Sequence, residues 1–295
     1  MAEERAHLPN WTGLLSWSTK YHDGTSASQF GPMDQDRRLW LEKALNAAFE
    51  GGEDPNQIMK KAVTEIQEGR ISVGLDMLDH VSDFPDCAEN IEILGALKEL
   101  VDLLKHDDRN VVKRTCEILT LYLPNNPKIQ LAAALKHNCM STIKSCILKH
   151  TDDSEVMTLG LSVLGNLIRN VAPLENGFLR ESGVRFTVSA CRTSFSPGSV
   201  QKVCSLLLSL AQRHDLTNER GEVEGLIHLA YTSDIIERDN IQVFETLAAL
   251  VARVGAADSV RDAIRQRLKW LDSLEETPRL NFSAELEILQ EFRMQ

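Results

Sequence analysis

The chain has 295 residues, 43% hydrophobic and 25% charged, which is enough for a sizeable buried core in two domains or in one extended solenoid. Its 43 acidic and 32 basic residues leave a net charge of −11, a balance that repels phosphate backbones and argues against a nucleic-acid-binding protein. No stretch approaches 18 uninterrupted apolar residues and the first ten residues lack an apolar core, so we expect neither a membrane span nor a secretory signal.

Cysteine usage indicates a reducing compartment. The six cysteines stand at positions 87, 116, 139, 146, 191 and 204, and no two form a Cys-x-x-Cys pair. Most of them lie among Ile, Leu and Val, where a thiol behaves as a small buried hydrophobe. We therefore expect a cytoplasmic protein without disulfides or a metal site.

The N-terminal part of the chain predicts an arm followed by a helical cap. Residues 1–34 are rich in Gly, Ser and Thr and predict a flexible arm, which carries a short apolar cluster of Leu14, Leu15 and Trp17. Within 35–68, apolar residues at three- and four-residue steps predict a pair of capping helices.

Residues 69–254 repeat a helical pattern. Val112, Val156 and Val200 stand at the same place in successive units, 44 residues apart, and a degenerate fourth unit reaches Ile241 after 41 more. A period near 44 with two long helices per unit is typical of armadillo or HEAT arrays. Residues 255–295 predict a second helical pair that caps the C-terminal end.

These patterns predict an all-α fold: an armadillo-repeat superhelix, or alpha solenoid, of about four repeats with helical caps at both ends. The last helix of each repeat should line the concave side, at 111–123, 155–170, 199–213 and 240–254. Pairs of aspartates at 107–108 and 152–153 fall where the next helix needs an N-cap. The neighbouring His106 and His150 raise the alternative of a metal site, but capping is the better explanation because each histidine recurs as part of the same turn. Proline-rich stretches at 124–127, 173 and 197 are interpreted as gaps between helices.

Motifs that carry chemistry are missing. The sequence has no phosphate-binding loop, no G-x-G-x-x-G, no H-E-x-x-H and no G-x-S-x-G. We therefore expect a binding protein and not an enzyme, with no cofactor.

Four segments carry a resemblance to a known family. They are the Leu-Leu-Ser-Trp-Ser run at 14–18, the helix-like run 38–49, the Pro-Asn-Asn-Pro turn at 124–127 and the Gly-Asn-Leu-Ile-Arg run at 165–169. Together they resemble the armadillo-type nucleotide exchange factors of heat shock protein 70 chaperones, which include the fungal Fes-type proteins and the animal heat-shock-protein-binding protein.

The resemblance implies a co-chaperone. Family members wrap their concave side around one lobe of the chaperone's ATPase domain and open the nucleotide cleft, so that ADP leaves. By linkage, ADP must then weaken binding of the factor as much as the factor weakens binding of ADP. The arm in this family is thought to imitate a chaperone client, a role that Leu14, Leu15 and Trp17 suit.

Position and resemblance together suggest partner-binding residues. Arg169 matches a concave arginine of the family and is expected to bind a carboxylate, the alternative being a charge that faces its own helix dipole. Asn166 either bonds a partner's backbone or satisfies a neighbouring loop, and Asn125 and Asn126 either contact the partner or only shape a turn. Tyr122 stands where the fungal family has a small residue.

A basic stretch suggests where an acidic partner would bind. Residues 91–150, which include Lys113, carry nine Lys or Arg and six Asp or Glu, a local charge of +3. The alternative to the exchange factor is an armadillo adaptor for extended peptides in transport or signalling. The repeated Trp and Asn pairs of importin-alpha-like grooves are missing, and so is a basic leader. A lumenal exchange factor is disfavoured by the missing signal, and the capped ends suggest a monomer.

Overall fold

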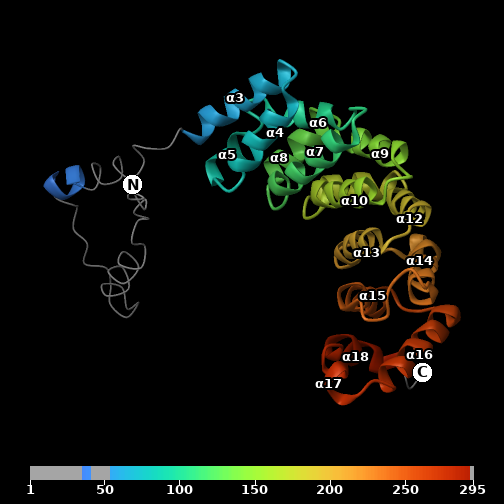
Figure 1. Cartoon of the computed structure of the whole chain (residues 1–295). Coiled ribbons are helices and arrows are strands. Elements are labelled where there is room, and N and C mark those ends of the chain that lie inside the picture. The colour runs from blue at the N-terminus through green and yellow to red at the C-terminus, as the bar shows by residue number, and fades with distance from the viewer. Residues whose placement is uncertain (1–34, 41–53, 293–295) are drawn as a thin grey trace, which may run out of the picture. The chain divides into compact units, whose positions relative to one another are not determined.

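The computed structural model describes residues 35–40 and 54–292, and its contacts divide the chain into two units, Met1–Glu53 and Asp54–Gln295 (Figure 1). In the first unit, residues 35–40 are helical and exposed. The predicted arm 1–34, with Leu14, Leu15 and Trp17, lies outside the described residues, as does most of the first capping helix. The second unit holds the elements described below.

The second unit is built from helices, and its described residues contain no strand. The helices are α3 (Pro55–Gln67), α4 (Ile71–His80), α5 (Pro85–Asn90), α6 (Ala96–Leu103), α7 (Arg109–Tyr122), α8 (Pro127–Leu135), α9 (Cys139–Lys149), α10 (Ser154–Ile168), α11 (Ala172–Arg180), α12 (Gly183–Thr193), α13 (Pro197–Ala211), α14 (Arg220–Thr232), α15 (Ile241–Val254), α16 (Asp258–Asp272), α17 (Glu276–Leu280) and α18 (Ser283–Leu289). Short 3-10 turns precede α14 (Thr217–Glu219) and follow α18 (Gln290–Phe292). A membrane-spanning helix is not found among the described residues.

The helices stack in chain order as two parallel rows. Helix α10 packs against α7 on one side and α13 on the other, α13 packs against α15, and α15 packs against α18. In Figure 1 this row lies on the inner side of a curve, with α9, α12, α14 and α16 on its outer side. The apolar core continues from repeat to repeat and includes all six cysteines, which are buried and form no disulfide within the described residues. The chain is therefore an all-α armadillo-type solenoid, as predicted.

The predicted concave helices agree with α7, α10, α13 and α15 to within two residues at each end. The short first helices α8 and α11 were not predicted, because their prolines were interpreted as gaps. Pro127 instead opens α8 and Pro173 stands in the first turn of α11, while Pro197 opens the inner helix α13 two residues before its predicted start. Proline suits that turn because the amide it lacks has no helical partner there. A repeat therefore has three helices, the armadillo arrangement, and not two.

Aspartate caps set the start of two inner helices, as predicted. The side chain of Asp108 accepts a hydrogen bond from the amide of Asn110 at 2.8 Å and begins α7. Asp153 accepts from the amides of Glu155 and Val156, each at 3.1 Å, and begins α10. Each cap satisfies amides that have no partner inside the helix, and so fixes where the inner helix starts in its repeat.

Candidate partner-binding face

One stripe of each inner helix is left incompletely buried after the repeats have stacked. We call these residues the inner face. On α7 they are Lys113, Arg114, Glu117, Thr120 and Leu121; on α10, Thr158, Leu159, Ser162, Asn166 and Arg169; on α13, Gln201, Lys202, Ser205, Leu208, Ser209 and Gln212; and on α15, Gln242, Glu245, Thr246, Ala249, Ala252 and Arg253. Small and uncharged polar side chains make up most of this face between α10 and α15. Protein interfaces carry about one hydrogen bond per 100–200 Å², and the polar side chains of this face can supply donors and acceptors for such bonds.

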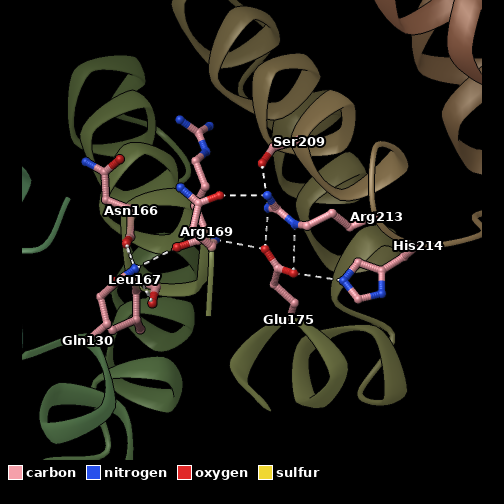
Figure 2. Close-up of polar contacts among 9 residues, drawn as sticks. Gln130, Asn166, Leu167, Arg169, Glu175, Ser209, Arg213 and His214 are labelled. Atoms are coloured by element: carbon pink, nitrogen blue, oxygen red, sulfur yellow. Dashed lines mark hydrogen bonds and ion pairs between the residues drawn. The ribbon is translucent and has the colours of Figure 1, made fainter. Parts of the chain in front are cut away.

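Gln130 fixes the end of α10, where Arg169 leaves the helix. Its side chain is buried in α8, and its Nε2 donates to the carbonyl oxygens of Asn166 at 2.7 Å, Leu167 at 3.2 Å and Arg169 at 2.9 Å (Figure 2). The last carbonyls of a helix have no partner within it, so Gln130 supplies what the helix lacks. The backbone of Arg169 is thereby held in place across 39 residues of sequence.

The guanidinium of Arg169 has no carboxylate partner among the described residues. Its Nη2 donates to Ser205 Oγ of α13 at 3.3 Å, while its Nε is buried and makes no hydrogen bond within the described structure. Burial lowers the pKa of Arg169, and the nearby Arg213 lowers it further, but an arginine stays charged in a protein. A half-buried charge without a counter-ion is unfavourable, so a carboxylate brought by a partner would relieve that cost.

Arg213, 44 residues after Arg169, has a different environment. Its guanidinium holds the buried Glu175 of α11 through Nε at 3.2 Å and through Nη2, and it also donates to Asn170 Oδ1 at 2.7 Å (Figure 2). His214 Nε2 lies 2.8 Å from the same carboxylate. Burial raises the pKa of Glu175, but the hydrogen bonds from His214 and Arg213 outweigh it and leave the pKa below its usual value. This network braces α11 against the end of α13, and Arg213 is neutralised within it.

Three of the residues predicted to bind a partner have a role in the fold instead. The ring of Tyr122 is buried, and its hydroxyl donates to the carbonyl of Leu78 at 2.8 Å, so Tyr122 belongs to the core and not to the inner face. Asn126 is the N-cap of α8, accepting from the amide of Ile129 at 3.3 Å. Asn125 is exposed in the left-handed region, with φ of 57°, a conformation that asparagine tolerates better than most residues. Both asparagines shape the turn between α7 and α8.

The remaining predicted residues lie on the inner face. Asn166 is half-buried, with its carbonyl bound by Gln130 and its side-chain amide unpaired within the described structure (Figure 2). Lys113 forms an ion pair with Glu155 and lies 3.6 Å from Asp153. Asn166 and Arg169 therefore have polar groups without partners in the described structure, whereas Lys113 already has counter-ions.

The basic stretch at 91–150 is neutralised by its neighbours. Eight of its nine cations lie within 4.0 Å of a carboxylate: Lys98, Lys105, Arg109, Lys113, Arg114, Lys136, Lys144 and Lys149. Several of these carboxylates lie outside the stretch, on α4, α10 and the turns before α10 and α12. The cations of the inner face that have no carboxylate partner within the described structure are Arg169, Lys202 and Arg253. The expectation that an acidic partner binds at the first repeat is therefore not supported by the structure.

The described part of the chain offers no cluster of metal-binding side chains. Residues 35–40 and 54–292 contain no group of three or more His, Cys, Asp or Glu side chains placed to hold a metal ion.

Sequence reasoning missed Gln130, Glu175, Arg213 and His214. The spacing of 44 residues between Arg169 and Arg213 was a signal that pointed to the second arginine.

Similarity to solved structures supports the fold. A designed armadillo repeat protein solved with the peptide (KR)4 matches with a TM-score of 0.57 at 12% identity, covering 80% of this chain and 100% of that chain. A computationally designed armadillo repeat protein for modular peptide recognition matches with a TM-score of 0.57 at 14% identity, covering 80% of this chain and 99% of that one. At such identities the likeness shows the armadillo fold alone.

A relative is found among proteins of assigned function, although no protein-family profile matches the chain. The relative is the Hsp70 nucleotide exchange factor FES1 of Gibberella zeae, 24% identical over 181 residues that cover 59% of this chain and 83% of that protein. The chain is thus an armadillo-repeat protein with weak sequence similarity to an Hsp70 nucleotide exchange factor.

Proposed function

We propose that this protein is a nucleotide exchange factor and co-chaperone. It binds the ATPase domain of a cytosolic Hsp70 chaperone with its inner face and promotes release of ADP, acting as a cytoplasmic monomer without catalysis of its own. The similarity to FES1 over 181 residues carries the proposal, because the matched region spans most of that protein. The armadillo fold of this chain agrees with the fold that the sequence predicted.

The inner face is suited to this role. Arg169 offers a guanidinium that lacks a counter-ion, at a helix end that Gln130 holds rigidly. A preorganised cation of this kind binds a carboxylate with little loss of conformational freedom. An exchange factor acts by binding the open, nucleotide-free chaperone more tightly than the closed one, so a rigid scaffold is what the mechanism requires.

The division of the chain follows from the same proposal. Residues 69–254 carry the repeats that contact the chaperone, while 35–68 and 255–295 cap the two ends of the stack. Residues 1–34 form an arm whose Leu14, Leu15 and Trp17 imitate a client and promote client release. Deletion of residues 1–20 should then slow client release and leave nucleotide release intact, whereas equal effects on both would remove the case for the arm.

The test of exchange activity is a stopped-flow measurement with a fluorescent ADP analogue bound to one purified cytosolic Hsp70. Wild-type protein should accelerate release in proportion to its concentration until it saturates the chaperone. Unchanged release at saturating protein would contradict the proposal. An armadillo adaptor for extended peptides, the alternative considered from the sequence, would show no acceleration and would bind extended peptides instead.

A further inference from the structure

Two hollows adjoin at the C-terminal ends of α13 and α15. One, of about 430 Å³, is lined by residues of the turn after α13 and by the last turn of α15, among them Gln212, His214 and Arg253. The other, of about 420 Å³, lies between α13 and α15 on the inner face and is lined by Leu208, Gln212, Ala249, Ala252 and Arg253. Because both hollows share Gln212 and Arg253, the arginine stands between them.

Arg253 is held in place by the backbone of the neighbouring repeat. Its Nε donates to the carbonyl of Ala211 at 2.8 Å, and its Nη2 donates to the carbonyl of Gln212 at 3.3 Å. Both carbonyls belong to the end of α13, where helix carbonyls lack partners. The Nη1 group makes no hydrogen bond within the described structure, and no described carboxylate lies within 4.0 Å of the guanidinium. Arg253 is therefore an oriented cation with donors to spare.

The other charged groups around the larger hollow are already engaged. Arg213 is bound to the buried carboxylate of α11 described above, and Arg220 donates from Nε to Glu224 at 2.9 Å. Asp215 accepts hydrogen bonds from the amide and the hydroxyl of the threonine two residues further on. Arg253 is thus the arginine of this hollow that no carboxylate of the described structure neutralises.

The shape of the smaller hollow indicates what accompanies the anion. Ala249 and Ala252 present only methyl groups, and Leu208 supplies an apolar wall. Small side chains at these places let the backbone of a second chain approach α15 closely, as side chains with longer stems would not. A ligand that places a carboxylate on Arg253 and a small apolar residue against Leu208, Ala249 and Ala252 would match both the charge and the apolar wall.

We propose that Arg253 binds an acidic side chain in an extended, acidic segment of a partner protein, with a small apolar residue of that segment between α13 and α15. The proposal rests on the proposed function for the identity of the partner, which would be the ATPase domain of the chaperone. It moves the point of acidic contact from the first repeat to the last one.

The first experiment leaves the chaperone out. Binding of a fluorescein-labelled alternating Glu-Ala peptide to the full-length protein is followed by anisotropy at low salt, with a Gln-Ala peptide as the neutral comparison. Wild type should bind the Glu-Ala peptide, and Arg253→Gln should weaken that binding about tenfold, the loss of one charge-assisted contact. Arg253→Lys, which keeps the charge, should lose less.

The matched control is Arg261→Gln. Arg261 also donates from Nε to a backbone carbonyl, that of Ala256 at 3.2 Å, and has no carboxylate partner within the described structure, but it lies on α16 in the outer row. Circular dichroism should give the same melting temperature for Arg253→Gln and Arg261→Gln to within a few degrees. No peptide binding by wild type, or equal loss in Arg253→Gln and Arg261→Gln, would overturn the proposal.

The second experiment repeats the comparison with the purified ATPase domain of an Hsp70. Selective loss of affinity in Arg253→Gln supports the proposal, and unchanged affinity with a wild type that accelerates ADP release overturns it. If wild type fails to accelerate release but the peptide result is selective for Arg253, then the proposed function fails while the acidic site stands for another partner.

Discussion

Replacement of Arg169 by alanine should separate binding from stability. The side chain makes one weak polar contact, from Nη2 to Ser205 Oγ at 3.3 Å, and its Nε is buried without a partner. Loss of such a contact costs about 0.5–1.5 kcal/mol, and removal of an uncompensated half-buried charge offsets part of that cost. We therefore expect Arg169→Ala to change the free energy of unfolding by less than about 1 kcal/mol.

Binding to the chaperone should change far more. A hydrogen bond to a charged group contributes about 1.5–3 kcal/mol, which corresponds to a loss of affinity of about 10- to 150-fold. Arg169→Ala should accordingly raise the concentration of protein that gives half-maximal acceleration of ADP release. Calorimetric titration with the isolated ATPase domain gives the affinity, and urea unfolding followed by circular dichroism gives the stability.

Arg213→Ala is the matched comparison, because it removes the arginine 44 residues further along. It leaves the buried Glu175 with fewer donors, so it should destabilise the protein by about 2 kcal/mol and affect binding less than Arg169→Ala does. A destabilisation of Arg169→Ala by more than about 2 kcal/mol, or an unchanged affinity, would refute the reasoning, because Arg169 would then be a structural brace like Arg213.

Three further substitutions test the structure itself. Glu285→Gln should destabilise the C-terminal cap by about 3 kcal/mol or more in urea unfolding, because Glu285 is fully buried and accepts from Nε and Nη2 of the buried Arg267 at 2.8 Å each. The control is Asp262→Asn, which breaks the exposed ion pair of Asp262 with Arg265 and should cost less than about 1 kcal/mol. Glu175→Gln should flatten the acid side of the stability profile. The folded pKa of Glu175 lies below its ordinary value, so the wild-type carboxylate stabilises the fold at pH values above that ordinary pKa and loses this contribution as the pH falls through the folded pKa. Urea unfolding at several pH values should show a smaller loss in the variant. Tyr122→Phe should cost about 1–2 kcal/mol by leaving a carbonyl at the end of α4 unpaired, and should leave the affinity for the chaperone unchanged in the calorimetric titration.

The repeats were predictable because they depend on periodicity. Each inner helix is long enough to show apolar residues at three- and four-residue steps over four turns, and the valines 44 residues apart set its register. The short first helices were not predictable in this way. Helices α8 and α11 span nine residues each and begin at or next to a proline. Their sequences therefore resemble turns, and the helices are recognised only from their packing against neighbouring helices.

Charge was less predictable than fold. The local charge of +3 at 91–150 depends on counting along the chain, whereas ion pairs form across the stack. Arg109, for example, lies 2.6 Å from Asp152, and Arg114 lies 2.7 Å from Asp79, and both carboxylates fall outside the counted stretch. In a solenoid each repeat contacts the next, so the net charge of one repeat says little about the cations that remain available.

A single position in the short first helix distinguishes the environments of Arg169 and Arg213. Gln130 and Glu175 are both the fourth residue of that helix, in α8 and α11, and both are buried beneath the end of the inner helix of their own or the adjoining repeat. The neutral amide of Gln130 donates to backbone carbonyls, so it orders the end of α10 and offers Arg169 no negative charge. The carboxylate of Glu175 draws Arg213 and a histidine onto itself. The two arginines stand at the same place in the repeat, and the difference between an amide and a carboxylate beneath them makes one a candidate for binding and the other a brace.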